Sequence, residues 1–352
     1  MIHELPYRRM LILTEGQLGV FSSKTGVSVM RYRREDCVGV LDSAFAGRRI
    51  EEVLAGTGIS GLPIFADVAG ALAAKPDSIL VGIAPSGGAL PEVMRRHLVD
   101  GLKHGLSIIS GLHTLLRDDP ELFALAEEHD AAIHDVRDPG PITRVAHGLA
   151  RRSRAKRVLT VGTDCNVGKM VTSLELRKAA RAAGLNAAFA ATGQTGIMIE
   201  GWGIAIDHTI SDFTAGAVEM LVEHAADADV IFIEGQGSIA NPGYSGVTLS
   251  LVHGCCPDAM VMVTRPDRTN HNDWPNCPVA PLMEQIDLYE RVLAPLHPGK
   301  VVAVAVNTAG RSAEEARRWV EQVAAETGLP AADPVRDGCG ELLAAVRKHL
   351  GI

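Results

Sequence analysis

The stretch that decides the fold is Arg157-Val-Leu-Thr-Val-Gly162-Thr-Asp-Cys-Asn-Val-Gly168-Lys169-Met170-Val-Thr172. Its apolar run predicts a buried strand, its two glycines a tight loop, and the residues after Gly168 a helix. In this arrangement the N–H groups of the loop and the helix N-terminus point into one concavity, where the charge of Lys169 also reaches a phosphate. We therefore predict a phosphate-binding loop with ligand contacts from Gly162, Thr163, Asp164, Cys165, Asn166, Val167, Gly168, Lys169 and Met170.

Met170 departs from an ordinary nucleotide-hydrolysing loop. There, a Ser or Thr follows the lysine and its hydroxyl binds Mg²⁺. A thioether is a poor ligand for a hard cation, and the next hydroxyl, that of Thr172, belongs to a different face of the helix. We therefore expect the loop to hold phosphates as a handle, with no metal, and coenzyme A is the ligand that we expect.

Composition limits the class of protein. The chain has 352 residues, is 47% hydrophobic and carries a formal net charge of −8. Its length suits two domains, and its negative charge argues against a nucleic-acid partner. The sequence has no apolar run long enough for a membrane span and no secretory signal. Six cysteines without metal-type spacing indicate reduced thiols. We expect a cytoplasmic protein with small-molecule substrates, no nucleic-acid or membrane partner, and self-association into a homo-oligomer.

The first part of the chain alternates strands and helices. Strands are predicted at 10–13, 37–41, 78–83, 106–109 and 131–134, and helices at 66–74, 91–104 and 120–129. This alternation predicts a doubly wound parallel sheet, which is a Rossmann-like domain. The turn at the end of Ile79 to Gly88 is either a ligand contact or a plain tight turn.

A domain junction is indicated by Asp138-Pro-Gly-Pro141 and the basic run Arg151 to Lys156. Proline, glycine and clustered charge are typical of linkers. We therefore divide the chain into a Rossmann-like domain at 1–145 and a P-loop domain at 146–352. The basic runs Arg31 to Arg34 and Arg151 to Lys156 are predicted to be solvated surface or linker.

The second part keeps the alternation and predicts the parallel sheet of a P-loop NTPase-like fold. Further strands are predicted at 187–191, 230–233, 259–263 and 301–306, and helices at 211–225, 281–293, 313–327 and 341–350. The fold class is therefore α/β in both domains.

Glu234 ends a predicted buried strand and is followed by Gly-Gln-Gly-Ser. Ligands bind at the carboxyl ends of strands in parallel sheets, so Glu234 is the first candidate for a catalytic acid or base. The N–H groups of this segment can polarise a carbonyl, and substrate contacts are predicted at Gly235, Gln236, Gly237 and Ser238. The polar stretch Asn241 to Thr248 is predicted to be a loop that covers the substrate.

Three other segments carry candidate residues. Asp212 either takes part in catalysis or caps a helix, and Glu219, seven positions later, can share a polar pocket with it. The segment Thr264 to Pro275 follows another strand and contains His271, a second candidate base. Asn307 ends the last buried strand and either binds a purine or a ribose or caps its loop.

Two arginines in the segment after Thr264 suit an acidic ligand. Guanidinium groups bind carboxylates in bidentate geometry, so Arg265 and Arg268 are predicted to bind the substrate. His271 and Asp273 lack a third ligand for a metal.

The loop Gly162 to Lys169, with Glu234-Gly-Gln-Gly237, resembles the dethiobiotin-synthetase-like branch of P-loop proteins. The whole chain is similar to a two-domain family first catalogued as being of unknown function, which has Lys-Met in the loop and a Rossmann-like domain before it. Ser211 to Glu219 and Arg265 to Pro275 also carry this resemblance, which covers essentially all 352 residues. Members of the family include D-glutamate N-acetyltransferases of the DgcN type.

The resemblance implies transfer of an acetyl group from acetyl-CoA to the amino group of D-glutamate, in D-amino acid catabolism. Such transfer requires a base that deprotonates the amine, and Glu234 is our first choice, with Asp212 or His271 as second. Two alternatives remain, namely an ATP-dependent ligase or kinase that acts on a small carboxylate, and a nucleotide-sensing module without catalysis.

Overall fold

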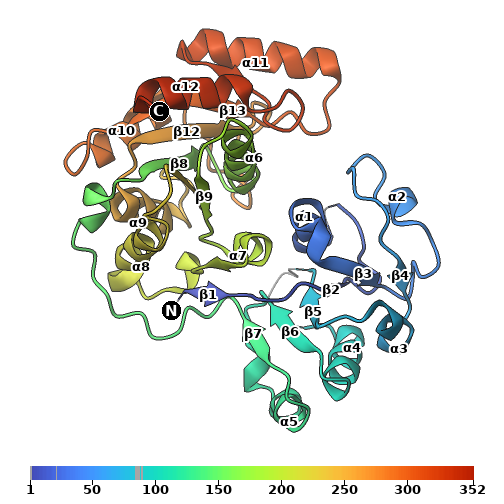
Figure 1. Ribbon diagram of the computed structural model, residues 1–352. Helices are drawn as coiled ribbons and strands as arrows, with labels where there is room; N and C mark the ends of the chain where they lie inside the picture. The colour runs from blue at the N-terminus through green and yellow to red at the C-terminus, as the bar shows by residue number, and fades with distance from the viewer. Residues whose placement is uncertain (1, 21, 84–87, 89) are drawn as a thin grey trace. The chain divides into compact units, whose positions relative to one another are not determined.

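Two parallel sheets organise the chain, each in its own structural unit (Figure 1). The computed structural model describes residues 2–20, 22–83, 88 and 90–352. The N-terminal unit contains residues 2–140 and 194–205, and the C-terminal unit contains residues 141–193 and 206–352. The predicted glycine-rich turn before Gly88 lies mostly outside the described residues.

The N-terminal unit is built on a parallel sheet. Along the sheet, its strands are β4 (Ile64–Phe65), β3 (Cys37–Leu41), β2 (Met10–Leu13), β5 (Ser78–Val81), β6 (Ser107–Ser110) and β7 (Ile133–Asp135). Its helices are α1 (Lys24–Tyr32), α2 (Ile50–Val53), α3 (Val68–Ala71), α4 (Glu92–Lys103) and α5 (Pro120–Glu128). Apolar side chains of α3, α4 and α5 form one core with β2, β5 and β6. The prediction of a doubly wound parallel sheet is confirmed.

The C-terminal unit has a second parallel sheet. Its strands in spatial order are β14 (Ala331–Ala332), β13 (Lys300–Val306), β12 (Ala259–Thr264), β8 (Lys156–Gly162), β11 (Val230–Ile233) and β9 (Ala187–Ala190). The predicted P-loop layout is confirmed, because β8 lies at the centre between β11 and β12 and leads directly into a helix.

Helices cover both faces of this sheet (Figure 1). They are α6 (Lys169–Ala182), α8 (Ser211–His224), α9 (Ser245–Cys255), α10 (Leu282–Leu293), α11 (Ala313–Thr327) and α12 (Gly340–Leu350). One core is formed by α6 and α12 against side chains of β8, β11, β12 and β13. Helices α8 and α9 pack on each other. A sheet with both faces covered requires strands that are apolar throughout, and β11 and β12 are fully buried.

Three expectations from the sequence are wrong in detail. Residues 194–205 were assigned to the C-terminal domain, but α7 (Gln194–Glu200) packs on α1, and β10 (Trp202–Gly203) pairs antiparallel with β1 (His3–Glu4). The predicted covering loop at 241–248 ends at Tyr244, because α9 begins at Ser245. Arg33 is buried rather than solvated, because its guanidinium group binds Asp36 and three backbone carbonyls.

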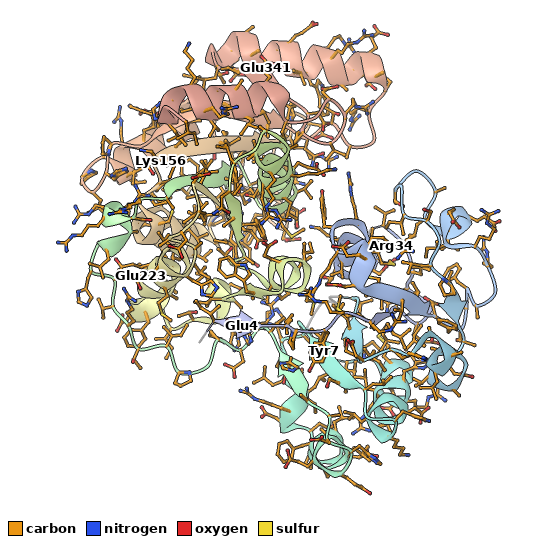
Figure 2. The ribbon with its side chains drawn as sticks, viewed as in Figure 1. Glu4, Tyr7, Arg34, Lys156, Glu223 and Glu341 are labelled. Carbon is orange, nitrogen blue, oxygen red and sulfur yellow. The ribbon has the colours of Figure 1, made fainter. Side chains whose placement is uncertain are left out.

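The junction segment is held by a buried carboxylate. Glu219 of α8 is fully buried and accepts hydrogen bonds from Arg144 and from the backbone N–H groups of His147 and Leu149. Arg144 also pairs with Glu223, which is labelled on α8 in Figure 2. Glu219 therefore does not share a pocket with Asp212, as the sequence had suggested, but anchors the segment that leads into β8.

No helix in the described ranges is long and apolar enough to cross a membrane.

Gly216 of α8 tests how closely this junction packs. A Cβ atom at Gly216 would lie 1.9 Å from the carbonyl oxygen of Arg144, so that Gly216→Ala forces the segment off the helix. We expect a loss of roughly 2 kcal/mol or more in the free energy of unfolding, although alanine is the better helix former. Gly246→Ala in α9 is the matched control, because nothing lies within 4 Å of its Cβ position. Denaturant unfolding of both variants measures the difference, and equal stability of the two would contradict it.

Candidate functional site

The carboxyl ends of four strands meet at one edge of the C-terminal sheet. Because β11, β8, β12 and β13 are parallel neighbours, the segments that follow them lie side by side. These segments are 163–168 after β8, 234–244 after β11, 265–275 after β12 and 307–312 after β13. They contain every site residue that the sequence predicted except Asp212, Gly162, Lys169 and Met170, and the last three adjoin the first segment.

The phosphate-binding loop closes tightly on itself. Gly168 has a φ of 115°, which is strained for any side chain. A Cβ atom at Gly162 would lie 2.9 Å from Val167 and 3.2 Å from Nζ of Lys169. The Lys169 ammonium donates to the carbonyl oxygen of Asp164 at 2.7 Å. The lysine is therefore folded over the loop, in the position from which it can exchange a carbonyl oxygen for a phosphate oxygen.

The hydroxyl nearest to Met170 is engaged in the helix. Thr172 is buried, and its Oγ1 donates to the carbonyl oxygen of Gly168 at 3.1 Å. Met170 is partly buried. The helix therefore does not present Thr172 as a substitute for the hydroxyl that binds Mg²⁺ in ordinary loops of this type.

Asp164 connects the loop to two other segments of the site. Its side chain is fully buried and accepts hydrogen bonds at 2.7–2.9 Å from four neighbours. These donors are Nδ2 of Asn241, Nη1 of Arg268, Nδ1 of His271 and the backbone N–H of Asn272. The loop residue that was predicted to contact a ligand thus organises the segments after β11 and β12.

The same hydrogen bonds determine the charge of Asp164. Burial raises the pKa of this carboxyl, but the donors Asn272, His271 and Asn241 outweigh burial and lower the pKa to about 2. An ionised carboxylate can only accept a hydrogen bond, so Nδ1 of His271 carries the proton that it shares with Asp164. In the described part of the chain, Nε2 has no hydrogen-bond partner. Asp164 therefore fixes the orientation of the His271 ring.

Glu234 lies where the sequence placed it, at the end of β11, and is buried. Its Oε2 accepts hydrogen bonds from the backbone N–H groups of Thr192 at 3.0 Å and Gly193 at 3.2 Å. The N–H of Gly235 donates to Oγ1 of Thr160 inside the sheet. This N–H group is therefore already engaged inside the sheet, and its contact with a substrate carbonyl stays a prediction.

The rest of the Glu234 segment is braced by its own side chains. Nε2 of Gln236 donates to the carbonyl oxygen of Thr192 at 2.5 Å, and Oγ of Ser238 donates to Gln285 at 3.3 Å. Gly237 has a φ of 61° and fits under Tyr244. Direct ligand contacts of Gln236, Gly237 and Ser238 stay a prediction.

Tyr289 of α10 was not found from the sequence. It is fully buried, its hydroxyl donates to the carbonyl oxygen of Gly162 at 3.0 Å, and it accepts from the N–H of Ile239 at 3.0 Å. Burial raises its pKa to about 12, so the hydroxyl stays protonated. Tyr289 thus connects the end of β8 to the Glu234 segment. Its position within a predicted helix, without a motif around it, made it resemble an ordinary core residue.

The two remaining candidates, Asp212 and Asn307, both have structural roles. Asp212 is exposed in the first turn of α8, where its charge favours the helix N-terminus. Nδ2 of Asn307 donates to the carbonyl oxygen of Val167, and its Oδ1 accepts from the N–H of Ala309. Of the two roles predicted for Asn307, the structure shows the supporting one, in which the amide braces the phosphate-binding loop.

Both predicted substrate arginines already have carboxylate partners. Arg265 makes a bidentate pair with Asp267, at 2.9 and 3.2 Å, and Arg268 pairs with Asp164. The two arginines line an open hollow of about 440 Å³ together with Asp267, Thr269, Asn270 and Pro275.

No three His, Cys, Asp or Glu side chains gather in metal-binding geometry within the ranges that the structure describes. The expectation of a site without metal stays a prediction.

The fold and site define a two-unit α/β protein with a phosphate-binding loop at the centre of its second sheet. Comparison with known proteins identifies the family of this chain. Residues 144–343 match the P-loop domain, and residues 43–139 the Rossmann-like domain, of DUF1611, a family described as a domain of unknown function. The chain belongs to this family.

Three relatives resemble nearly the whole chain. A D-glutamate N-acetyltransferase of Tritonibacter scottomollicae is 37% identical, with 97% of this chain and 98% of the relative covered. One of Pseudoalteromonas is 36% identical, with 92% and 94% covered. The crystal structure of a DUF1611 family protein of Anabaena variabilis is 42% identical, with a TM-score of 0.89 over 97% of this chain and 99% of that one.

Replacement of Asp164 tests its role in the site. Asp164→Asn leaves the charge of Arg268 without its partner, and we expect a loss of roughly 3 kcal/mol in the free energy of unfolding at pH 7. The lowered pKa means that the carboxylate stabilises the fold above about pH 4 and that this contribution is lost as the pH falls toward 2. The difference between wild type and variant should therefore shrink by about 1 kcal/mol from pH 5 to pH 3.

Urea unfolding across this pH range measures the difference. Asp337→Asn, at an exposed residue of the same unit, is the control and should change stability by less than about 0.5 kcal/mol. A difference between wild type and Asp164→Asn that stays constant with pH would show that the carboxylate is not held ionised.

Proposed function

We propose that this protein is an acyltransferase that moves an acetyl group from acetyl-CoA to the amino group of D-glutamate. The observation that carries the proposal is the similarity, over nearly the full length of both chains, to two proteins named D-glutamate N-acetyltransferase. Both units of the fold are included in that similarity, so it extends beyond the phosphate-binding loop that many unrelated proteins share.

The residues at the centre of the second sheet fit the phosphates of the donor. The cradle between Gly162 and Gly168 has no room for a Cβ atom at Gly162, and Lys169 lies directly above it. Met170 and the engaged hydroxyl of Thr172 suit phosphates that are held but not transferred. When bound, acetyl-CoA supplies an acetyl group activated as a thioester.

The acceptor amine requires a base. An amino group with a pKa of roughly 8 or more is mostly protonated at neutral pH, and removal of its proton by a positioned side chain contributes about 10²–10⁴-fold to the rate. We assign this role to Nε2 of His271, because Asp164 orients the ring and leaves Nε2 available. Glu234, the first choice from the sequence, becomes second, since its Oε2 already accepts two backbone N–H groups.

The reaction is tested by thiol release. Purified protein is mixed with acetyl-CoA and D-glutamate, L-glutamate or no amino acid, each with and without EDTA. We expect release that depends on D-glutamate and is insensitive to EDTA, since no phosphoryl group is transferred. The absence of release together with Mg²⁺-dependent ATP turnover would overturn the proposal in favour of a ligase or kinase.

The base is tested by replacing His271. His271→Gln keeps a polar side chain of similar length but cannot accept a proton, and we expect kcat to fall by about 10²–10⁴-fold. Glu234→Gln should reduce kcat less, because its amide oxygen still accepts the N–H groups of Thr192 and Gly193. His349→Gln, on the exposed surface of α12, is the matched control. A larger loss in Glu234→Gln than in His271→Gln would reverse the assignment.

A further inference from the structure

Two arginines, Arg265 and Arg268, line the hollow beside the phosphate-binding loop, and a third, Arg311, pairs with Asp267 of its lining. Asp267 accepts from Arg265 and also from Nη2 of Arg311 at 2.6 Å. Arg268 pairs with Asp164. The Arg265 guanidinium lowers the pKa of Asp267, and Arg311 adds to this effect, so this carboxylate is ionised at neutral pH. Arg311 also interacts electrostatically with Glu315, so three guanidinium groups and three carboxylates lie close together here.

The arginines also keep unused hydrogen-bond donors. Arg265 pairs through Nε and Nη2, and Arg268 through Nη1. Nε of Arg311 is buried and has no hydrogen-bond partner within the described ranges. Arg311 is held in place by the ring of Trp319, with 5.0 Å between the guanidinium carbon and the ring centroid. A guanidinium group that is already fixed loses little entropy when it binds an anion.

The position of the hollow indicates which anion it suits. Arg268 lines the hollow and donates to the carbonyl oxygen of Cys165 in the phosphate-binding loop at 3.3 Å. The hollow and the loop therefore share a wall. A ligand with a pyrophosphate and a further phosphate on its ribose carries one anionic group for each of these two neighbouring sites.

We propose that the hollow lined by Arg265, Arg268 and Asp267, with Arg311 paired to Asp267, binds the ribose phosphate of the acyl donor. This inference rests on the proposed function and deepens it, because it makes the enzyme selective for coenzyme A over its dephospho form. It also reassigns Arg265 and Arg268 from the acceptor carboxylates that the sequence suggested to the donor. A phosphomonoester, with nearly two negative charges and three acceptor oxygens, gains more than a carboxylate from guanidinium groups that keep unused donors.

Binding is measured by calorimetry with acetyl-CoA and with acetyl-dephospho-CoA. We expect wild type to bind acetyl-CoA at least about 10-fold more tightly, which is the effect of one charge-assisted hydrogen bond. Arg265→Ala and Arg311→Ala should each lose most of this preference and bind the dephospho form as wild type does. Arg317→Ala removes an equal charge from the exposed surface of α11 and should keep the preference. Equal affinity of wild type for both donors would overturn the proposal.

Steady-state kinetics separates donor from acceptor. In Arg265→Ala and Arg311→Ala we expect the KM for acetyl-CoA to rise while the KM for D-glutamate stays the same. A rise in the KM for D-glutamate alone would show that these arginines bind the carboxylates of the acceptor, and it would overturn the proposal. Thermal unfolding checks that the variants are folded, since Asp267 keeps one arginine partner in each.

Ligands without an acetyl group distinguish the two possible failures. Adenosine 3′,5′-bisphosphate and 5′-AMP differ by the phosphate that the hollow is proposed to bind. Equal affinity for both ligands overturns the proposal that the hollow binds the ribose phosphate, whatever the transfer assay shows. Tighter binding of the bisphosphate supports the hollow, and if no thiol is released from acetyl-CoA with D-glutamate, acetyl transfer alone is overturned.

Discussion

The buried carboxylate of Asp164 is the interaction on which the site depends. It belongs to the phosphate-binding loop, yet its four donors come from the segments that follow β11 and β12. A fully buried charge is tolerated only when it is paired and hydrogen-bonded, and here each donor is also a component of the site. The loop, the candidate base and one arginine of the hollow therefore take up their positions together.

This arrangement connects the phosphate-binding loop with His271, the base that we propose. In ordinary loops of this type the residue after the lysine and its metal ion neutralise a reacting phosphoryl group. Here Met170 occupies that position, and the charged groups lie instead on neighbouring strand ends. The geometry suits a ligand whose phosphates fix its position while the chemistry takes place elsewhere, which agrees with an acyl donor that carries a nucleotide handle.

Glu234 and His271, two of the three candidates for the catalytic base, differ in their surroundings. Glu234 is tied to the end of β9 by two N–H groups, so that it stabilises the edge of the sheet whatever else it does. His271 is fixed from one side only, by Asp164. A side chain with one tethered and one available end is suited to proton transfer, and His271 meets this condition better than Glu234.

The sequence by itself determined both sheets, the phosphate-binding loop and the loss of its hydroxyl at position 170, because these are local patterns of apolar runs, glycines and single residues. It also identified His271 and the arginines as candidates, since they follow a buried strand. Only the tertiary structure decided their partners. Each of these partners lies far away in the chain. Asp164 pairs with His271, Tyr289 braces the end of β8, α7 packs within the first unit, and the carbonyl oxygen of Met198 helps to bury Arg33. Such contacts depend on strand order and helix packing, and residue patterns along the chain do not encode them in any form that can be read locally.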